Sequence, residues 1–230
     1  MINNPYSEGQ VLVIDKPLEW TSFDLVNKIR YAIKDKYKIK KIKVGHAGTL
    51  DPLATGVVVV CTGKKTKIID GFLVEDKEYV GKIQLGSTTP SFDLETDVDN
   101  YYKVPYIDQS KIDFLIKKFS GELDQVPPIY SAKRINGKRA YQFARANEKI
   151  SLTAKKVEIK ELDLSLESEN ILSFRCKCSK GTYIRALARD IGFALNSGAF
   201  LIELRRIRSG SFSIDDAKLI DDWVDIIKSS

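Results

Sequence analysis

The segment from Gly45 to Gly56, GHAGTLDPLATG, is the most informative part of the chain for chemistry. It places a carboxylate, Asp51, at the tip of a turn-rich loop, together with His46, the single histidine of the chain. Glycine and proline impose an unusual backbone path on such a segment, and loops held by a rigid scaffold often carry active-site groups. The alternative is that Asp51 caps a turn and His46 is a structural histidine, and spacing alone favours this alternative.

Composition and spacing exclude several other kinds of site. The stretch from Gly56 to Lys65 is not a phosphate-binding P-loop, because six residues separate its glycines where that loop has four. One histidine and three cysteines offer no plausible zinc set, so we expect no zinc site. The odd cysteine count does not suggest a disulfide-stapled secreted fold. Cys176 and Cys178 are expected to share the inner face of a strand.

The distribution of positive charge favours an anionic partner. The net charge is +6 and the pI about 9.0. Six lysines lie in the ten residues from Lys34 to Lys43, and a second basic group surrounds the Asn136-Gly137 turn. Either group alone is typical of a solvated surface. Two of them flanking the chemical motifs favour contacts with phosphates.

The elements that must position these residues can be predicted from hydrophobic periodicity. Strands are expected at residues 11–14, 57–61, 78–85, 156–166, 171–178 and 205–212. A first helix is expected after a cap at Thr21 or Ser22, with Phe23, Val26, Ile29, Arg30 and Ile33 along one side. A second helix is expected after a capping box at 110–113 and should end at Gly121. Two further helices are expected at residues 184–195 and 216–227. Hairpins and intermixed helices predict an α/β or α+β fold, with a single mixed, largely antiparallel sheet flanked by helices.

The remaining segments predict loops and a location. Residues 87–100 are predicted as a polar loop, and Gln125 to Arg139 as a long basic binding loop or lid. No stretch approaches the apolar length of a membrane span. The polar start, Met1 to Gln10, lacks the apolar core of an export signal, so we expect a cytoplasmic protein.

Several segments, in order along residues 11–212, resemble the TruB family of bacterial tRNA pseudouridine synthases. The Asp51 segment resembles the active-site motif of this family. The other matching segments are Asp15-Lys16-Pro17 with Thr21-Ser22, Thr66-Lys67, Lys77-Glu78-Tyr79, 125–132, 137–145, Gly181-Thr182-Tyr183-Ile184-Arg185 and Leu204-Arg205-Arg206.

The resemblance implies a pseudouridine synthase fold and a reaction. A uracil in the T-arm of tRNA, at position 55, is cut from its ribose at N1, turned, and rejoined through C5 without a cofactor. Asp51 is implied as the nucleophile at the ribose C1′ or the base C6, or as a base at C2′. Arg185 would pair with Asp51 and keep it charged. Tyr79 would stack on the target base, and its hydroxyl is a candidate for removing the C5 proton, whereas core packing is the common fate of a strand tyrosine.

Other matching positions are implied to bind substrate or RNA. A base inside a folded T-loop must be extruded, at a cost of about a few kcal/mol, and the His46 imidazole would fill the vacated space. The other positions in this group are Lys67, Asp93, Tyr130, Arg145 and Leu204. An RNA-gripping segment is expected at about residues 121–150 of a single catalytic domain, 1–230, which we expect to be a monomer.

The sequence departs from the family at two places. Longer members carry a C-terminal RNA-binding PUA module, and only 18 residues follow Phe212 here, so no such module is expected. Pro90 stands where relatives often carry an aspartate, which puts the contacts of that loop in doubt.

Two other functions stay open: an RNA-binding protein without catalysis, and a synthase of the guide-RNA-dependent branch. The presence of Asp51, Tyr79 and Arg185 argues against the first, and the short chain against the second.

Overall fold

The structure is a computed structural model that describes residues 4–131, 134–135, 138–146, 148 and 152–230. The chain divides into two compact units, residues 1–79 with 204–230, and residues 80–203. Strands β4 (Lys77–Leu85) and β12 (Ala199–Ser209) each begin in one unit and end in the other. The two units are therefore described separately.

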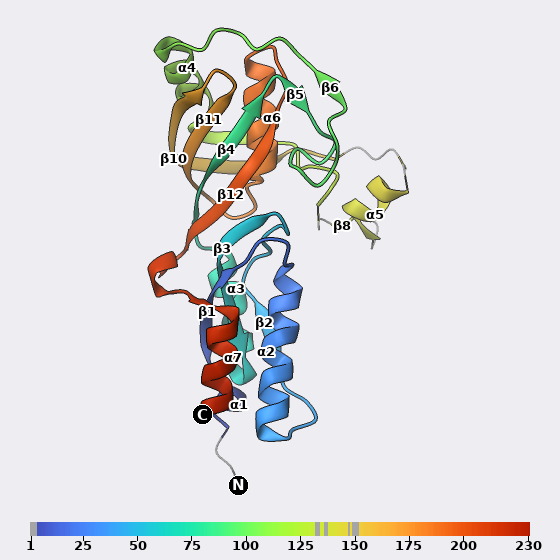
Figure 1. Cartoon of the computed structure of the whole chain (residues 1–230), viewed down its shortest axis with the longest axis vertical. Helices are drawn as coiled ribbons and strands as arrows, with labels where there is room; N and C mark the ends of the chain where they lie inside the picture. Colours follow the sequence, from blue (N-terminus) through green and yellow to red (C-terminus); the bar gives the residue numbers. More distant parts are fainter. Residues whose placement is uncertain (1–3, 132–133, 136–137, 147, 149–151) are drawn as a thin grey trace. The chain divides into compact units, whose positions relative to one another are not determined.

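Ten strands of the described residues form one hydrogen-bonded sheet in the order β14-β1-β3-β12-β4-β11-β10-β7, with β2 on β3 and β13 on β12 (Figure 1). The strands not yet bounded are β1 (Val11–Lys16), β2 (Val44–His46), β3 (Ala54–Thr62), β7 (Gly121–Gln125), β10 (Lys155–Ser168), β11 (Ile171–Cys178), β13 (Phe212–Ser213) and β14 (Lys218–Leu219). β1 pairs with β14, and β3 with β12, in parallel. The pairs β1–β3, β2–β3, β10–β11, β10–β7 and β12–β13 are antiparallel. The predicted mixed, largely antiparallel sheet flanked by helices is confirmed.

The first unit is built around β3. Residues 57–61 of this strand are completely buried, as the continuous apolar run predicts. Helix α2 (Ser22–Tyr37) begins at a Thr21 capping box and packs against α7 (Ile220–Ser229) and β2 (Figure 1). The short helices α1 (Pro5–Glu8), η1 (Gly63–Ile68) and α3 (Ile69–Leu73) complete this unit.

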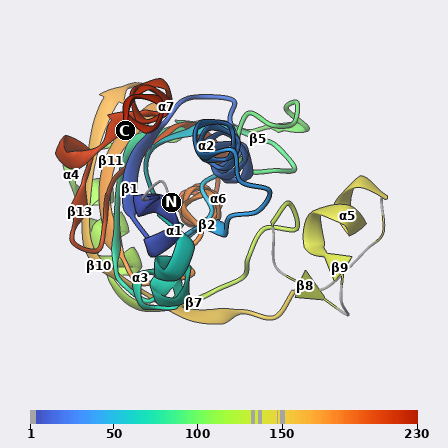
Figure 2. The ribbon, with the colours of Figure 1, turned by 90° about the horizontal axis from the view of Figure 1, so that it is seen from below.

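The second unit joins a hairpin to two helices. β10 and β11 are the predicted strand pair, and Cys176 and Cys178 are both buried, as expected. Helix α4 (Gln109–Phe119) packs on β10 and against α6 (Ile184–Ala194). β5 (Ser87–Thr88) pairs with β6 (Asn100–Tyr101). Figure 2 shows β8 (Arg134–Ile135), β9 (Lys138–Arg139) and α5 (Ala140–Arg145) close together, and β8 pairs with β9.

Two predictions about helices were wrong in detail. α4 begins at Gln109 because the carboxylate of Asp108 accepts a hydrogen bond from the Lys111 amide (2.9 Å), so the expected Ser110 capping box does not form. It ends at Phe119, and Gly121 follows the Ser120 cap with φ of +90°, as expected of a helix-ending glycine; Gly121 also opens β7, a strand that was not predicted. On α2 the buried stripe contains Leu25, Val26, Ile29, Ala32 and Ile33, whereas Phe23 is 60% exposed.

Predictions for the C-terminal elements needed a similar correction. β12 starts six residues earlier than expected and ends at Ser209, where Gly210, with φ of +58°, turns the chain into β13. The last helix begins at Ile220 rather than residue 216. The preceding residues form a 3-10 turn, η2 (Ile214–Asp216), and then β14, which adds to the edge of β1.

Candidate functional site

The loop that carries Asp51, residues 47–53, joins two paired strands of the first unit. β2 pairs with the far half of β3, with His46 opposite Val60, and the Ala47 amide donates to the Val59 carbonyl (2.8 Å). Ala47 belongs to a buried cluster with Val13, Val57 and Val59. The loop is thus fixed to the core of the unit at both ends, while Asp51 itself is half-buried.

Ser22, the first residue of α2, holds the loop one residue before Asp51. Its hydroxyl accepts from the Leu50 amide (2.9 Å) and donates to the Leu50 carbonyl (3.3 Å). Both groups are buried, where an unpaired polar group is costly. The N-terminus of α2 is therefore joined directly to the loop.

Lys16 holds the other side of the loop. Its side chain is completely buried, and its ammonium donates to the carbonyls of Pro17 (2.8 Å), Trp20 (2.6 Å) and Pro52 (3.1 Å). Burial lowers the pKa of Lys16 to about 8, and the charge of Asp51 opposes that shift while Arg206 adds to it. Lys16 is therefore a buried cation in the electrostatic field of Asp51.

Arg206 is the third side chain that holds the loop, and it is 1% exposed. Its guanidinium donates to the carbonyls of Val57 (2.7 Å), Gly48 (3.2 Å) and Thr49 (3.4 Å). Arginine presents several donors in a rigid fork, so one side chain joins both the start of the loop and the strand after it.

Gly56 explains how two long cationic side chains reach the same loop. In the sheet, Gly56 pairs with Lys16 on one side and with Arg206 on the other. Residues paired across strands point to the same face, so Lys16 and Arg206 flank a position without a side chain. A Cβ on Gly56 would lie 2.2 Å from the Arg206 carbonyl oxygen, and its φ is +106°. Glycine is therefore required at the centre of this row.

The opposite face of the same strands carries a separate polar group. Arg205 donates to both carboxylate oxygens of Asp15 (3.0 and 2.7 Å) and to the Thr55 hydroxyl (3.2 Å). These side chains are partly exposed. Adjacent residues of a strand alternate between faces, which separates Arg205 from Arg206.

The structure places four further predicted residues in the first unit. His46 ends β2, and burial lowers the pKa of its ring, with Arg206 acting in the same direction. Its Nδ1 atom is buried and has no hydrogen-bond partner among the described residues. Leu204 pairs with Ala54, just after the loop. Tyr79 is a buried residue of β4, and Lys67 is exposed on η1.

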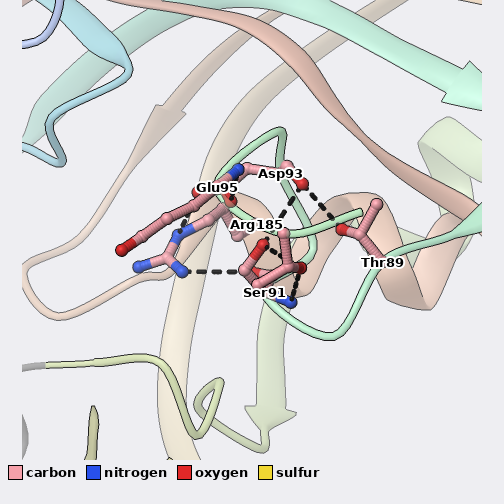
Figure 3. A network of polar contacts seen from close by, with 6 residues as sticks. Thr89, Ser91, Asp93, Glu95 and Arg185 are labelled. Carbon is pink, nitrogen blue, oxygen red and sulfur yellow. Dashed lines mark hydrogen bonds and ion pairs between the residues drawn. The ribbon is translucent and has the colours of Figure 1, made fainter. Parts of the chain in front are cut away.

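Arg185 and Asp93 come together in the second unit (Figure 3). Arg185, the second residue of α6, is 4% exposed, and its Nε lies 3.4 Å from the Asp93 carboxylate. It also donates to the Ser91 carbonyl (3.0 Å). The hydroxyls of Thr89 and Ser91 donate to the Asp93 carbonyl (2.7 and 3.2 Å). Within the predicted polar loop 87–100, residues 89–93 therefore form a hydrogen-bonded turn that buries an ion pair, whereas most of residues 94–100 are exposed.

The other predicted residues of this unit are only partly described. Tyr130 is half-buried. Arg145 ends α5, and its side chain lies outside the described residues, as do Ala132, Lys133 and the Asn136-Gly137 turn. Nearby, the Gln125 side chain forms two hydrogen bonds with the Tyr183 backbone (2.8 and 3.1 Å), which attaches β7 to the start of α6.

The structure thus groups Asp51 with His46 and Leu204 in one unit, and Arg185 with Asp93 in the other. Pairing of Asp51 with Arg185 stays a prediction. Lys16, Ser22 and Arg206 were quoted in the matching segments but given no role. For Lys16 a signal was available in the sequence, because a lysine at the end of a buried apolar strand is a buried charge that requires hydrogen-bond partners. Among the described residues, no group of three His, Cys, Asp or Glu side chains is placed to hold a metal ion.

Two family models together match residues 34–227. Residues 34–184 match the N-terminal domain of the TruB family pseudouridylate synthases, and residues 185–227 match a C-terminal domain of tRNA pseudouridylate synthase B. The chain belongs to the TruB family. It is 52% identical over 220 residues to tRNA pseudouridine synthase B of Parabacteroides distasonis, covering 94% of each chain. It is 51% identical to tRNA pseudouridine synthase B of Phocaeicola vulgatus, covering 96% of this chain and 95% of the relative.

Solved structures agree with this membership of the TruB family. The chain superimposes with a TM-score of 0.70 and 29% identity on a chain of a Cbf5-Nop10-Gar1 complex, covering 96% of this chain. A structure of an H/ACA RNP bound to a substrate RNA gives a TM-score of 0.67 and 28% identity over the same share. The chain spans about half the length of these two solved chains, 54% in each case.

None of the described helices is both long and apolar enough to cross a membrane.

Proposed function

We propose that this TruB-family protein converts the T-loop uridine of tRNA, at position 55, to pseudouridine, and that Asp51 is the nucleophile. The observation that carries the proposal is the position of Asp51 on a loop whose backbone is held by three buried side chains, those of Lys16, Ser22 and Arg206. A reacting group held in one geometry lowers the entropic cost of reaching the transition state. The names of the curated relatives support the substrate.

The reaction exchanges one bond of the uracil for another. The bond between N1 and the ribose C1′ breaks, the base turns, C5 bonds to C1′, and the proton on C5 leaves. An ionised Asp51 serves as the nucleophile at C1′ or at C6, or as a base at C2′. Each route needs the carboxylate close to the nucleotide and charged. Lys16 and Arg206 provide two buried positive charges beside the loop, and these attract the anionic RNA substrate.

Arg185 and Tyr79 complete the proposed catalytic group. Arg185 is fixed at the start of α6 by Asp93 and the Ser91 carbonyl, and in the proposal it orients Asp51 when the substrate is bound. Tyr79 stacks on the target base. His46 fills the space left by the extruded nucleotide, a role that suits a ring whose pKa is lowered by burial and which is therefore neutral at pH 7.

The remaining proposed roles concern RNA binding. Leu204 lies in register with the residue after the Asp51 loop and is proposed to contact the substrate. Lys67 offers an exposed cation. Tyr130 and Arg145 belong to the segment proposed to grip the T-arm. We further propose that the protein acts in the cytoplasm, where its tRNA substrate is found. We also propose that it acts as a monomer and uses no cofactor.

The test is pseudouridine formation on an unmodified tRNA transcript, without added metal or cofactor, mapped by carbodiimide labelling and primer extension. The wild-type protein should produce a single stop at the T-loop uridine. Asp51→Asn should abolish the product while leaving tRNA binding largely intact. Asp70→Asn, which removes an exposed carboxylate of the same unit, serves as the matched control. Full activity of Asp51→Asn would refute the proposed nucleophile, and tRNA binding without any product would favour a binding protein.

The likeness to solved H/ACA components motivates one alternative, a synthase that requires a guide RNA. The identity of about half to relatives named tRNA pseudouridine synthase B favours the tRNA enzyme instead. Activity on bare transcript separates the two, because a guide-dependent enzyme would leave that transcript unmodified.

A further inference from the structure

Helix α2 presents an exposed face that begins at the Asp51 loop. Its first residue, Ser22, is hydrogen-bonded to Leu50, and its sixteen residues extend for about 24 Å. Phe23 and Tyr31 lie eight residues apart, and residues at this spacing share one side of a helix. They are 60% and 72% exposed. Two large aromatic rings therefore face solvent along a helix attached to the proposed catalytic loop.

Lysines continue this exposed face at the far end of α2. Lys34 is exposed in the last turn, and the segment that follows exposes Lys40, Lys41 and Lys43. None of these four lysines has an ion pair with any described residue. By contrast, Lys38 is neutralised by Asp35 (3.0 Å). The positive charge at this end of the helix is thus left uncompensated.

The backbone brings a second group of lysines to the same place. The Gly63 amide donates to the Lys43 carbonyl (2.8 Å), which attaches η1 to the segment after α2. η1 exposes Lys65 and Lys67, whereas its Lys64 pairs with Glu8 (2.6 Å). The lysine surface, defined as Lys34, Lys40, Lys41, Lys43, Lys65 and Lys67, therefore rests on two segments joined by a hydrogen bond.

We propose that the exposed face of α2 and the lysine surface form a second RNA-contact surface, which binds phosphates of the tRNA away from the nucleotide at Asp51. This inference rests on the proposed function, because it assumes that a tRNA lies at the Asp51 loop. Tyr31, an exposed ring three residues before the unpaired Lys34, suits a nucleic acid, whose bases and riboses pack on rings while its phosphates attract lysine. The length of α2, about 24 Å, places Lys34 and the lysines just after the helix, Lys40 and Lys41, too far from Ser22 and the loop to contact the flipped nucleotide.

The test compares salt dependence of tRNA binding between matched variants. Lys40, Lys41 and Lys43 are changed together to Gln in an Asp51→Asn background, which prevents turnover. The control changes Lys103, Lys117 and Lys218 to Gln, three lysines exposed elsewhere whose replacement removes the same net charge. The thermal unfolding midpoint of each variant checks that it folds.

Three lost phosphate contacts should reduce the magnitude of the slope of log Kd against log salt by roughly 2 to 3. Between 50 and 200 mM salt the parent protein should then lose roughly 16- to 64-fold more affinity than the variant, from the same slope. Tyr31→Ser should weaken binding without changing the slope. An unchanged slope in the lysine variant, or one equal to that of the control, would overturn the proposal.

A different acidic partner is an outcome of the same experiment. If the lysine variant kept its tRNA affinity and slope but lost sedimentation with phosphatidylserine vesicles, the surface would be a membrane contact and the proposal would be wrong. Failure of the proposed function is seen separately, as absence of pseudouridine in the wild-type assay. The binding comparison does not depend on product formation.

Discussion

Replacing Arg206 with methionine should destabilise the first unit by about 3 kcal/mol and reduce kcat about a hundredfold. Methionine keeps much of the length of the side chain but leaves three backbone carbonyls without their donor. A hydrogen bond to a charged group contributes about 1.5–3 kcal/mol. One of the three is short at 2.7 Å and two are long, at 3.2 and 3.4 Å, and loss of the buried cation offsets part of their sum.

The effect on kcat follows from the position of two of these carbonyls, which precede Asp51 by two and three residues. A displacement of about 1 Å in a reacting group can cost a hundredfold in rate. Arg205→Met is the matched control, because Arg205 is the adjacent residue on the opposite face. Its partly exposed ion pair with Asp15 contributes about 1 kcal/mol or less.

The assay is urea unfolding followed by tryptophan fluorescence. Both tryptophans, Trp20 and Trp223, belong to the first unit, so the signal reports the part of the chain that holds Asp51. The Trp223 indole donates to the Val13 carbonyl (2.9 Å), which ties it to β1. The reasoning is refuted if Arg206→Met is no less stable than Arg205→Met, or if it keeps the wild-type kcat at saturating tRNA.

Three other predictions follow from the same group of residues. Because His46 is the single histidine, its NMR titration needs no assignment, and its pKa should lie below 6.5. The contribution of His46 to stability is then present above pH 6.5 and is lost as the pH falls through the folded-state pKa. Arg206→Met should raise the pKa of His46, and an unchanged pKa would contradict the contribution of Arg206. Gly56→Ala should lower the free energy of unfolding by about 3 kcal/mol or more, because its Cβ would lie 2.2 Å from the Arg206 carbonyl oxygen. Gly121→Ala is the control, because Gly121 has a φ of +90° but nothing within 4 Å of its Cβ position, and it should cost only about 1–2 kcal/mol in thermal unfolding. Equal costs would be inconsistent with the close approach at Gly56. The pKa of Lys16 is about 8 in the folded state, below its unfolded value of 10.5. The unfolding free energy of the wild type, measured relative to that of Lys16→Met, should therefore rise between pH 8 and 10.5 by at most about 1.4 kcal/mol per pH unit. If denaturant titrations gave the same difference at every pH, the lowered pKa would be wrong.

The fold was predictable where one periodicity dominated. The apolar run from Val57 to Cys61 and the alternation of residues 171–178 are each satisfied by a single arrangement, and both became the expected strands. The prediction was wrong where two local signals competed. Asp108 and Ser110 both suit a helix cap, and only the hydrogen bond to Lys111 decides between them.

The candidate site was predictable at Asp51 and not at the side chains that hold its loop. Arg206 lies far from Lys16 and Ser22 in the sequence, and the common feature of the three is that they bind backbone carbonyls and amides of one loop. Backbone groups have no identity in a sequence, so no spacing rule reveals such partners. The row of Lys16, Gly56 and Arg206 exists only because β1 and β12 both pair with β3.

The chemistry of the loop explains why its main supports are cationic donors. Residues 47–53 must present a carboxylate at Asp51, and the carbonyls around it need donors. Lysine and arginine supply donors and no acceptors, so they satisfy the carbonyls without competing with a carboxylate for donors. Their charge also attracts an anionic substrate. A neutral donor such as the Ser22 hydroxyl holds the backbone equally well at Leu50 but adds no such field. We therefore expect Arg206→Gln, which keeps two donors but removes the charge, to recover more of the stability lost in Arg206→Met than of the lost kcat. Equal recovery of both would mean that Arg206 acts through loop geometry alone.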